Sequence, residues 1–146
     1  MTPSEATNSA TRREWQALGF FYDRDDAART WRIVGSIAGL RAFVELLQAY
    51  CREPRNAGLG EHDHYGPYMY LKIMTWHDAG ISGNAIHGSL DDLRRLAGLI
   101  EQRLREATPG DTLAVGKTYV PECEYDLVLE IRDAGFDPAG ADPCLR

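Results

Sequence analysis

The sequence contains little that would indicate a catalyst or a membrane protein. Its 146 residues include three cysteines, Cys51, Cys123 and Cys144, and these form no Cys-x-x-Cys or other clustered spacing. No apolar run approaches the roughly 18 residues that a membrane-spanning helix needs. The first ten residues contain no hydrophobic segment typical of a secretion signal. We therefore expect reduced thiols and a cytoplasmic protein that does not contact a membrane.

Basic charge is also scarce. The 16 Lys and Arg residues are outnumbered by 22 Asp and Glu residues, which gives a formal net charge of −6. This balance excludes the overall basic character of nucleic-acid-binding domains. The length and the ordinary globular composition indicate one domain. We predict a single α+β domain over residues 14–134, a flexible N-terminal tail over residues 1–13 and an irregular C-terminal tail over residues 135–146.

Signatures of catalysis are missing as well. Cys51 falls on the apolar stripe of a helix expected from Ile37 to about Arg52, where a thiol behaves as a small hydrophobic group. Ser36 and Ser89 each precede a predicted helix and are explained as helix caps. Neither serine lies in a Gly-x-Ser-x-Gly elbow, and the chain has no Walker or Rossmann glycine pattern. We expect no cofactor and predict that the protein is not an enzyme.

The strongest positive signal is an internal repeat. Residues 33–41 (IVGSIAGLR) match residues 86–94 (IHGSLDDLR) at a constant offset of 53 residues. Both copies predict a strand, a sharp glycine corner, a serine cap and an amphipathic helix. A chance match is the alternative, because Gly-Ser before a leucine-rich helix is common.

Apolar and aromatic runs around the two copies indicate strands. The predicted strands cover residues 15–22, 30–34, 68–77, 85–87, 111–117 and 125–132. Together they predict an α+β fold of two ββα units plus a C-terminal β-hairpin. We expect one six-stranded, largely antiparallel sheet with both helices on one face.

Such a fold leaves the other face of the sheet open to a partner. The strand over residues 68–77 would place Tyr68, Tyr70, Lys72, Met74 and Trp76 there, and an exposed aromatic stripe is typical of a binding surface. The alternative is that loops or the C-terminal tail cover this face. The predicted partner-binding residues are Glu61, His62, Asp63, His64, Tyr65, Tyr68, Tyr70 and Trp76.

Two histidines in this set are also weak candidates for metal ligands. His62 and His64 are two residues apart, so both would point the same way from an extended segment, as a metal pair requires. A zinc site needs three or four converging ligands, and the sequence shows no second tight pair. The alternative is a polar loop whose side chains cap backbone groups or contact a partner.

The repeated Gly-Ser-x-x-x-Leu-Arg motif, at residues 35–41 and 88–94, resembles small immunity proteins of bacterial polymorphic-toxin systems, of the immunity protein 32 type. The resemblance covers the two strand–helix units. It implies an acidic α+β protein that binds and blocks a cognate toxin, without assigning any contact residue.

The charge of the chain is compatible with this role, because acidic groups speed the encounter with a basic toxin. Our first hypothesis is a non-enzymatic binding protein. The alternatives are a small metal- or ligand-binding enzyme centred on His62 and His64, and a structural homodimer formed through the open sheet.

Overall fold

Both long helices begin where the sequence predicts, at a serine that follows a glycine corner. In the computed structural model, which describes residues 4–145, α2 spans Ile37–Arg52 and α3 spans Leu90–Arg105. Each cap serine accepts a hydrogen bond from the backbone N–H three residues later, at 3.1 Å for Ser36 and 3.0 Å for Ser89. The two copies of the repeat therefore have the same local structure, which agrees with the preference for serine at helix N-caps.

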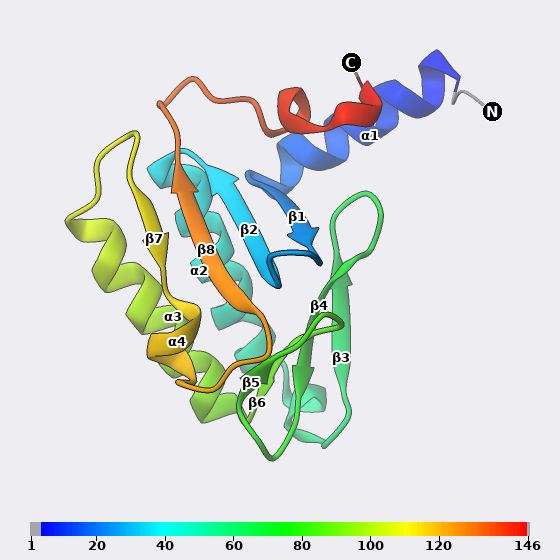
Figure 1. The fold of residues 1–146 in the computed structure, drawn as a ribbon. Helices are drawn as coiled ribbons and strands as arrows, with labels where there is room; N and C mark the ends of the chain where they lie inside the picture. Colours follow the sequence, from blue (N-terminus) through cyan, green and yellow to red (C-terminus); the bar gives the residue numbers. More distant parts are fainter. Residues whose placement is uncertain (1–3, 146) are drawn as a thin grey trace.

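The strands form two sheets instead of one (Figure 1). The first sheet has the order β1-β2-β8-β7 and the second has the order β3-β4-β6-β5. The strands are β1 (Phe21–Asp25), β2 (Thr30–Gly35), β3 (His62–Tyr65), β4 (Leu71–Thr75), β5 (Gly80–Ile81), β6 (Ile86–Gly88), β7 (Thr112–Ala114) and β8 (Asp126–Ile131). The α+β class is confirmed, but the prediction of one six-stranded, largely antiparallel sheet is wrong.

The pairing of the strands explains this error. The strand that leads into each long helix pairs in parallel with a strand outside its own hairpin, β2 with β8 and β6 with β4. Two short strands, β3 and β5, lie at the edges of the second sheet, in segments that the sequence predicted as loop and turn. The predicted strand over residues 68–77 begins only at Leu71, because Met69 has a left-handed backbone (φ 62°) that interrupts the extended run.

The N-terminal segment also differs from the prediction. Residues Glu5–Leu18 form helix α1, so the expected flexible tail over residues 1–13 is wrong from residue 5 onward, and residues 1–3 lie outside the described residues. Gly19, with a φ of 93°, ends the helix. Trp15 is the buried side chain of α1. A helix that docks through one large side chain carries almost no apolar periodicity, which is why the sequence pattern did not reveal it.

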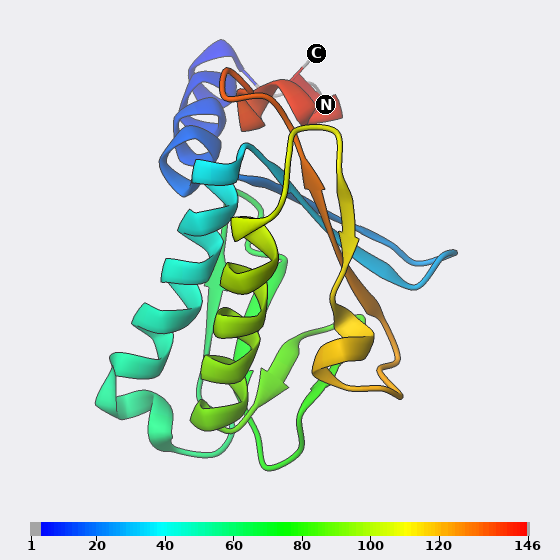
Figure 2. The same cartoon turned by 90° about the vertical axis from the view of Figure 1, so that its left-hand side faces the viewer.

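The main core lies between the two long helices and the inner faces of both sheets. Figure 2 shows α2 and α3 side by side, and their buried side chains join those of both sheets in one cluster. A short helix, α4 (Gly116–Tyr119), precedes β8. Among residues 4–145, no helix is both long and apolar enough to cross a membrane.

The C-terminal segment returns to the N-terminal helix. Two 3-10 turns, η2 (Pro138–Ala141) and η3 (Pro143–Leu145), run beside α1 (Figure 1). The Gln16 side-chain amide donates to the Asp137 carboxylate, and an Arg12 N–H donates to the carbonyl of Leu145. The segment predicted as an irregular tail is thus packed against α1 as far as residue 145.

Candidate binding surface

The predicted binding segment begins as strand β3, which forms one edge of the second sheet. His62 and His64 alternate with the half-buried Asp63 and Tyr65, so both imidazoles lie on the exposed side, with ring centroids 5.2 Å apart. Each Nδ1 atom lies 3.0 Å from a backbone carbonyl oxygen, that of Gly60 for His62 and that of Met69 for His64. The histidines therefore point the same way, as the sequence predicted, and each has one ring nitrogen in contact with the backbone.

A metal site at this pair lacks further ligands. Residues 4–145 contain no group of three or more His, Cys, Asp or Glu side chains that could hold a metal ion. The cross-strand neighbours of His62 and His64 are Met74 and Lys72. A lysine ammonium group repels a cation, so this face of the sheet is unsuited to a divalent ion.

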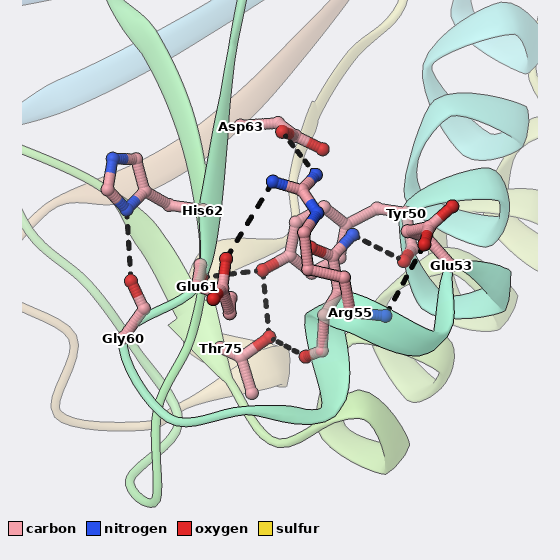
Figure 3. Close-up of polar contacts among 9 residues, drawn as sticks. Tyr50, Glu53, Arg55, Gly60, Glu61, His62, Asp63 and Thr75 are labelled. Atoms are coloured by element: carbon pink, nitrogen blue, oxygen red, sulfur yellow. Dashed lines mark hydrogen bonds and ion pairs between the residues drawn. The ribbon is translucent and has the colours of Figure 1, made fainter.

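The two predicted acidic contacts on this segment face a basic side chain (Figure 3). Arg55, in the 3-10 turn η1 (Pro54–Ala57), lies 3.0 Å from the Asp63 carboxylate and 3.7 Å from the Glu61 carboxylate. Exposed ion pairs of this kind contribute only about 0–1 kcal/mol to stability. They nevertheless offset the negative charge, so Glu61 and Asp63 attract a basic partner less than their sequence suggests.

A buried polar network holds the start of β3 in place (Figure 3). The Tyr50 hydroxyl donates to the carbonyl of Glu61 at 2.8 Å, and the Thr75 hydroxyl donates to the carbonyl of Asn56 at 2.5 Å. The Asn56 side-chain amide donates to the carbonyl of Tyr50. Burial raises the pKa of Tyr50, so this phenol remains a hydrogen-bond donor at neutral pH. These contacts are structural and offer no reactive group to a substrate.

The predicted aromatic stripe is divided between the two ends of β4. Tyr68 and Tyr70 lie in the loop before β4, whereas Trp76 follows the strand and packs beside His77, with ring centroids 4.7 Å apart and the rings tilted by 40°. Six residues of extended chain span about 20 Å. The exposed aromatic rings therefore lie at the two ends of the predicted stripe, and the half-buried Lys72 and Met74 lie between them. The homodimer hypothesis, which depends on this stripe, stays a prediction.

The loop over residues 66–70 instead displays three consecutive hydrophobic side chains. Tyr68, Met69 and Tyr70 are 39%, 56% and 68% exposed. The Tyr22 hydroxyl donates to the carbonyl of Tyr65 at 2.6 Å and accepts from the backbone N–H of Tyr70 at 3.2 Å. This one hydroxyl from β1 therefore bonds the backbone on both sides of the loop.

A glycine allows the close approach of Tyr22. Gly66 has a φ of 86°, and a Cβ atom there would lie 2.5 Å from the Tyr22 hydroxyl oxygen. A side chain at this position would strain the backbone and collide with the ring. Together with the contact between His64 and the carbonyl of Met69, these features fix the backbone of the loop.

Beside this loop lies a hollow of about 360 Å³, the aromatic hollow. Its aromatic lining consists of Trp15, Phe21, Tyr22, Trp31, Tyr68 and Tyr70, and its other lining residues are Asp23, Arg24, Asp142 and Pro143. These residues come from α1, the β1–β2 hairpin, the loop over residues 66–70 and the C-terminal turns. Figure 1 shows these segments next to one another at the upper right of the fold.

Asp142 joins three of these segments. Its carboxylate accepts hydrogen bonds from the indole N–H of Trp15 at 2.9 Å, the hydroxyl of Tyr68 at 2.6 Å and the backbone N–H of Cys144 at 2.9 Å. The residue is only 2% exposed. Burial and the neighbouring carboxylate raise the pKa of Tyr68, which keeps its phenol protonated and able to donate.

Sequence reasoning found only part of this hollow. Tyr68 and Tyr70 were predicted as partner contacts, but Trp15, Tyr22 and Asp142 were not. The density of aromatic residues over 15–22 was the available signal. The contact between Trp15 and Asp142 spans 127 residues and has no local signature.

No protein-family model, curated protein or solved structure matches this chain. A ligand for this surface can therefore be inferred only from the chemistry of its own residues. The described residues display a fixed hydrophobic loop, an aromatic hollow on one side of it and, on the other, a groove lined by Glu14, Ala17, Leu18 and Met69. Such a combination is typical of a surface that recognises another molecule.

Proposed function

We propose that this chain is a non-enzymatic binding protein that docks a basic protein partner on the loop over residues 66–70. The observation that carries the proposal is the exposure of Tyr68, Met69 and Tyr70 on a loop with a fixed backbone. Tyrosine and methionine are enriched in interface cores. Because the loop is already ordered, a partner avoids much of the entropy loss that ordering a flexible loop would require.

The charges beside the loop favour a basic partner. Asp142 lines the aromatic hollow and Glu14 lines the groove on the other side of the loop. Within residues 4–145, neither carboxylate forms an ion pair. The net charge of −6 adds a long-range attraction for a positively charged protein. Charge complementarity of this kind increases both the rate and the specificity of association.

The specific form of the proposal is an immunity protein that neutralises a cognate toxin. The resemblance of the repeated Gly-Ser-x-x-x-Leu-Arg motif supports it. Neutralisation by an immunity protein requires tight binding and no chemistry of its own. A fixed hydrophobic loop flanked by carboxylates provides the contacts for such binding.

The test is affinity capture from extracts of the organism that encodes the protein. The double variant Met69→Asn/Tyr70→Ser removes the hydrophobic loop side chains, keeps a residue type that tolerates a positive φ and leaves Tyr68 bonded to Asp142. Trp76→Ser is the matched control, because it removes an exposed aromatic ring at the other end of β4.

We expect the wild type and the Trp76→Ser control to retain one basic protein, and the double variant to lose it. Expression of the captured protein alone should stop cell growth, and coexpression with the wild-type chain should restore it. Equal capture by the double variant would refute the placement of the interface. Normal growth on expression of the captured protein would refute the immunity role.

A further inference from the structure

We infer that the aromatic hollow binds an organic cation, a guanidinium or alkylammonium group that the partner presents as an arginine or lysine side chain. This inference rests on the proposed function and specifies the chemistry of the partner's anchor. It is carried by the arrangement of the rings, by a guanidinium that already lies in the hollow, and by the charge balance of the lining residues.

The rings of the hollow face one another at steep angles. The ring of Trp15 is tilted by 44° to Phe21, 65° to Tyr22 and 70° to Tyr68, with centroids 4.9 to 6.1 Å apart. Tyr70 continues the cluster, 6.3 Å from Tyr68. The contacts of Trp15 with Tyr22 and Tyr68 are edge-to-face, and the buried rings of the cluster support Tyr68 and Tyr70, the two aromatic residues that are exposed. Exposed tyrosine rings of this kind bind cations through cation–π contacts.

The guanidinium of Arg24 already lies beside one ring of the hollow. The Cζ atom of Arg24 lies 5.7 Å from the ring centroid of Trp31, and its Nε atom lies 2.7 Å from the Asp26 carboxylate. Arg24 also donates to the carbonyl of Gly83. The chain itself therefore shows that a guanidinium is compatible with the rings at this site.

The other charges leave the hollow with an excess of negative charge. Asp23 forms an ion pair with Arg32 at 2.5 Å, and Arg24 forms one with Asp26. Asp142 accepts its three hydrogen bonds from neutral donors and has no cationic partner within residues 4–145. Because the protein interior screens charge weakly, this carboxylate exerts a strong field on the adjacent space.

The dimensions of the hollow suit a side chain. A volume of about 360 Å³ lies at the small end of the range for ligand pockets, roughly 300 to 1,000 Å³. Tyr68 and Tyr70 are the exposed aromatic residues of the lining, beside the exposed Arg24 and Pro143, and both tyrosines belong to the loop on which the partner docks. A basic side chain next to the partner's contact surface would therefore reach these two rings without any movement of the loop.

The three tryptophans of the chain provide a direct test by NMR. Trp15 and Trp31 line the hollow, and their indole N–H groups donate to Asp142 and to the carbonyl of Ser82, whereas Trp76 lies outside the hollow. We would titrate the intact protein with N-acetylarginine amide, N-acetyllysine amide and tetramethylammonium. N-acetylcitrulline amide is the neutral match for the arginine probe.

We expect the three cations to shift the indole signals of Trp15 and Trp31 with a Kd of about 1 mM, as suits ligands of this size. Citrulline should have no effect, and the Trp76 signal should not move. Tyr70→Ala should raise the Kd roughly two- to fivefold, whereas Tyr70→Phe should preserve it. Asp142→Asn should also weaken binding, and the Tyr70 variants keep the test valid if Asp142→Asn fails to fold.

Equal shifts with arginine and citrulline, or no shift of Trp15 and Trp31 with any cation, would overturn the inference. A competition experiment identifies the source of the cation: N-acetylarginine amide at ten times its Kd should raise the apparent Kd of the partner about tenfold, whereas the citrulline amide should leave it unchanged. If the cations bind but do not change the partner's apparent Kd, the assignment to a partner side chain is wrong. If a partner is captured through Tyr70 but no cation binds, the proposed function stands and this inference fails.

Discussion

The packing of α1 against α2 can be tested by a substitution at one glycine. Gly39 lies in the first turn of α2, and a Cβ atom there would overlap the carbonyl oxygen of Gly19, which ends α1. That carbonyl cannot turn away without disturbing the left-handed C-cap, whose N–H bonds to the carbonyl of Trp15 at 3.0 Å. Gly39→Ala should therefore displace α1, the helix that carries Trp15 into the aromatic hollow.

The expected change in the free energy of unfolding is the sum of two opposing effects. Replacing glycine by alanine inside a helix stabilises it by about 1 kcal/mol. Overpacking a buried site typically costs about 1–3 kcal/mol, and a clash with backbone falls at the upper end. We expect Gly39→Ala to reduce the free energy of unfolding by about 1–2 kcal/mol. The matched control is Gly98→Ala in α3, where a Cβ atom would meet nothing within 4 Å. It should stabilise the protein by about 0.5–1 kcal/mol.

Urea denaturation followed by circular dichroism measures both changes, with the m-value as a check on two-state behaviour. The indole NMR signal of Trp15 should also move in Gly39→Ala and stay in place in Gly98→Ala, because only the first variant displaces α1. If Gly39→Ala were as stable as Gly98→Ala, α1 would not lie against the first turn of α2. The position of Trp15 in the lining of the aromatic hollow would then also be wrong.

Three further predictions concern hydrogen bonds and charge. Tyr22→Phe removes the hydroxyl that bonds Tyr65 and Tyr70, so we expect a loss of about 1–2 kcal/mol in unfolding free energy and faster amide exchange at Tyr70. Burial acts to raise the pKa of Glu130, but hydrogen bonds and charge from Arg32 and Arg132 outweigh it and lower the pKa on balance. Glu130 therefore stabilises the fold above its ordinary pKa and loses this effect as the pH falls below that value. The melting temperature of Glu130→Gln should drop less than that of the wild type between pH 5 and pH 3. Ser36→Ala and Ser89→Ala should each reduce the free energy of unfolding by about 1 kcal/mol, because each removes the hydroxyl that caps one helix. The reciprocal bond from the backbone N–H of residue 89 to Asp92 survives Ser89→Ala, so the two losses should be similar, and thermal unfolding with no loss in either variant would show that the caps contribute nothing.

Local features of the sequence were sufficient to predict the strand–cap–helix units. A glycine corner, a serine hydroxyl and leucines at helical spacing act within a few residues of one another, so their pattern is visible in the sequence. The pairing of β2 with β8 is different, because it joins segments that are far apart in the sequence, such as those of Trp31 and Leu127. Parallel strands pair across long connections that carry no register signal, so one sheet could not be told from two.

The candidate site likewise has features that the sequence predicts and features that it does not. The exposure of His62, His64 and Tyr70 could be predicted from a polar, aromatic segment. The hollow could not, because Trp15 belongs to a segment predicted as a strand, and Asp142 to a segment predicted as an irregular tail. In the structure Trp15 is the buried side chain of α1, and the C-terminal turns dock through Pro138, Ala139 and Asp142, which are too few in each segment to create a periodic pattern.

Some of the contacts that join the two sheets also shape the binding surface. Tyr22 connects β1 of the first sheet to the loop of the second sheet, and Asp142 connects that loop to α1 and the C-terminal turns. A partner bound to the loop therefore requires all of these segments to be in place. By linkage, a partner at 100 times its Kd should stabilise the native state by about 2.7 kcal/mol. Because the loop depends on both sheets, this stabilisation should extend to the amides of β1 and α1, which the partner need not touch. Protection from hydrogen exchange confined to residues 66–70 would show that the loop is independent of the hollow.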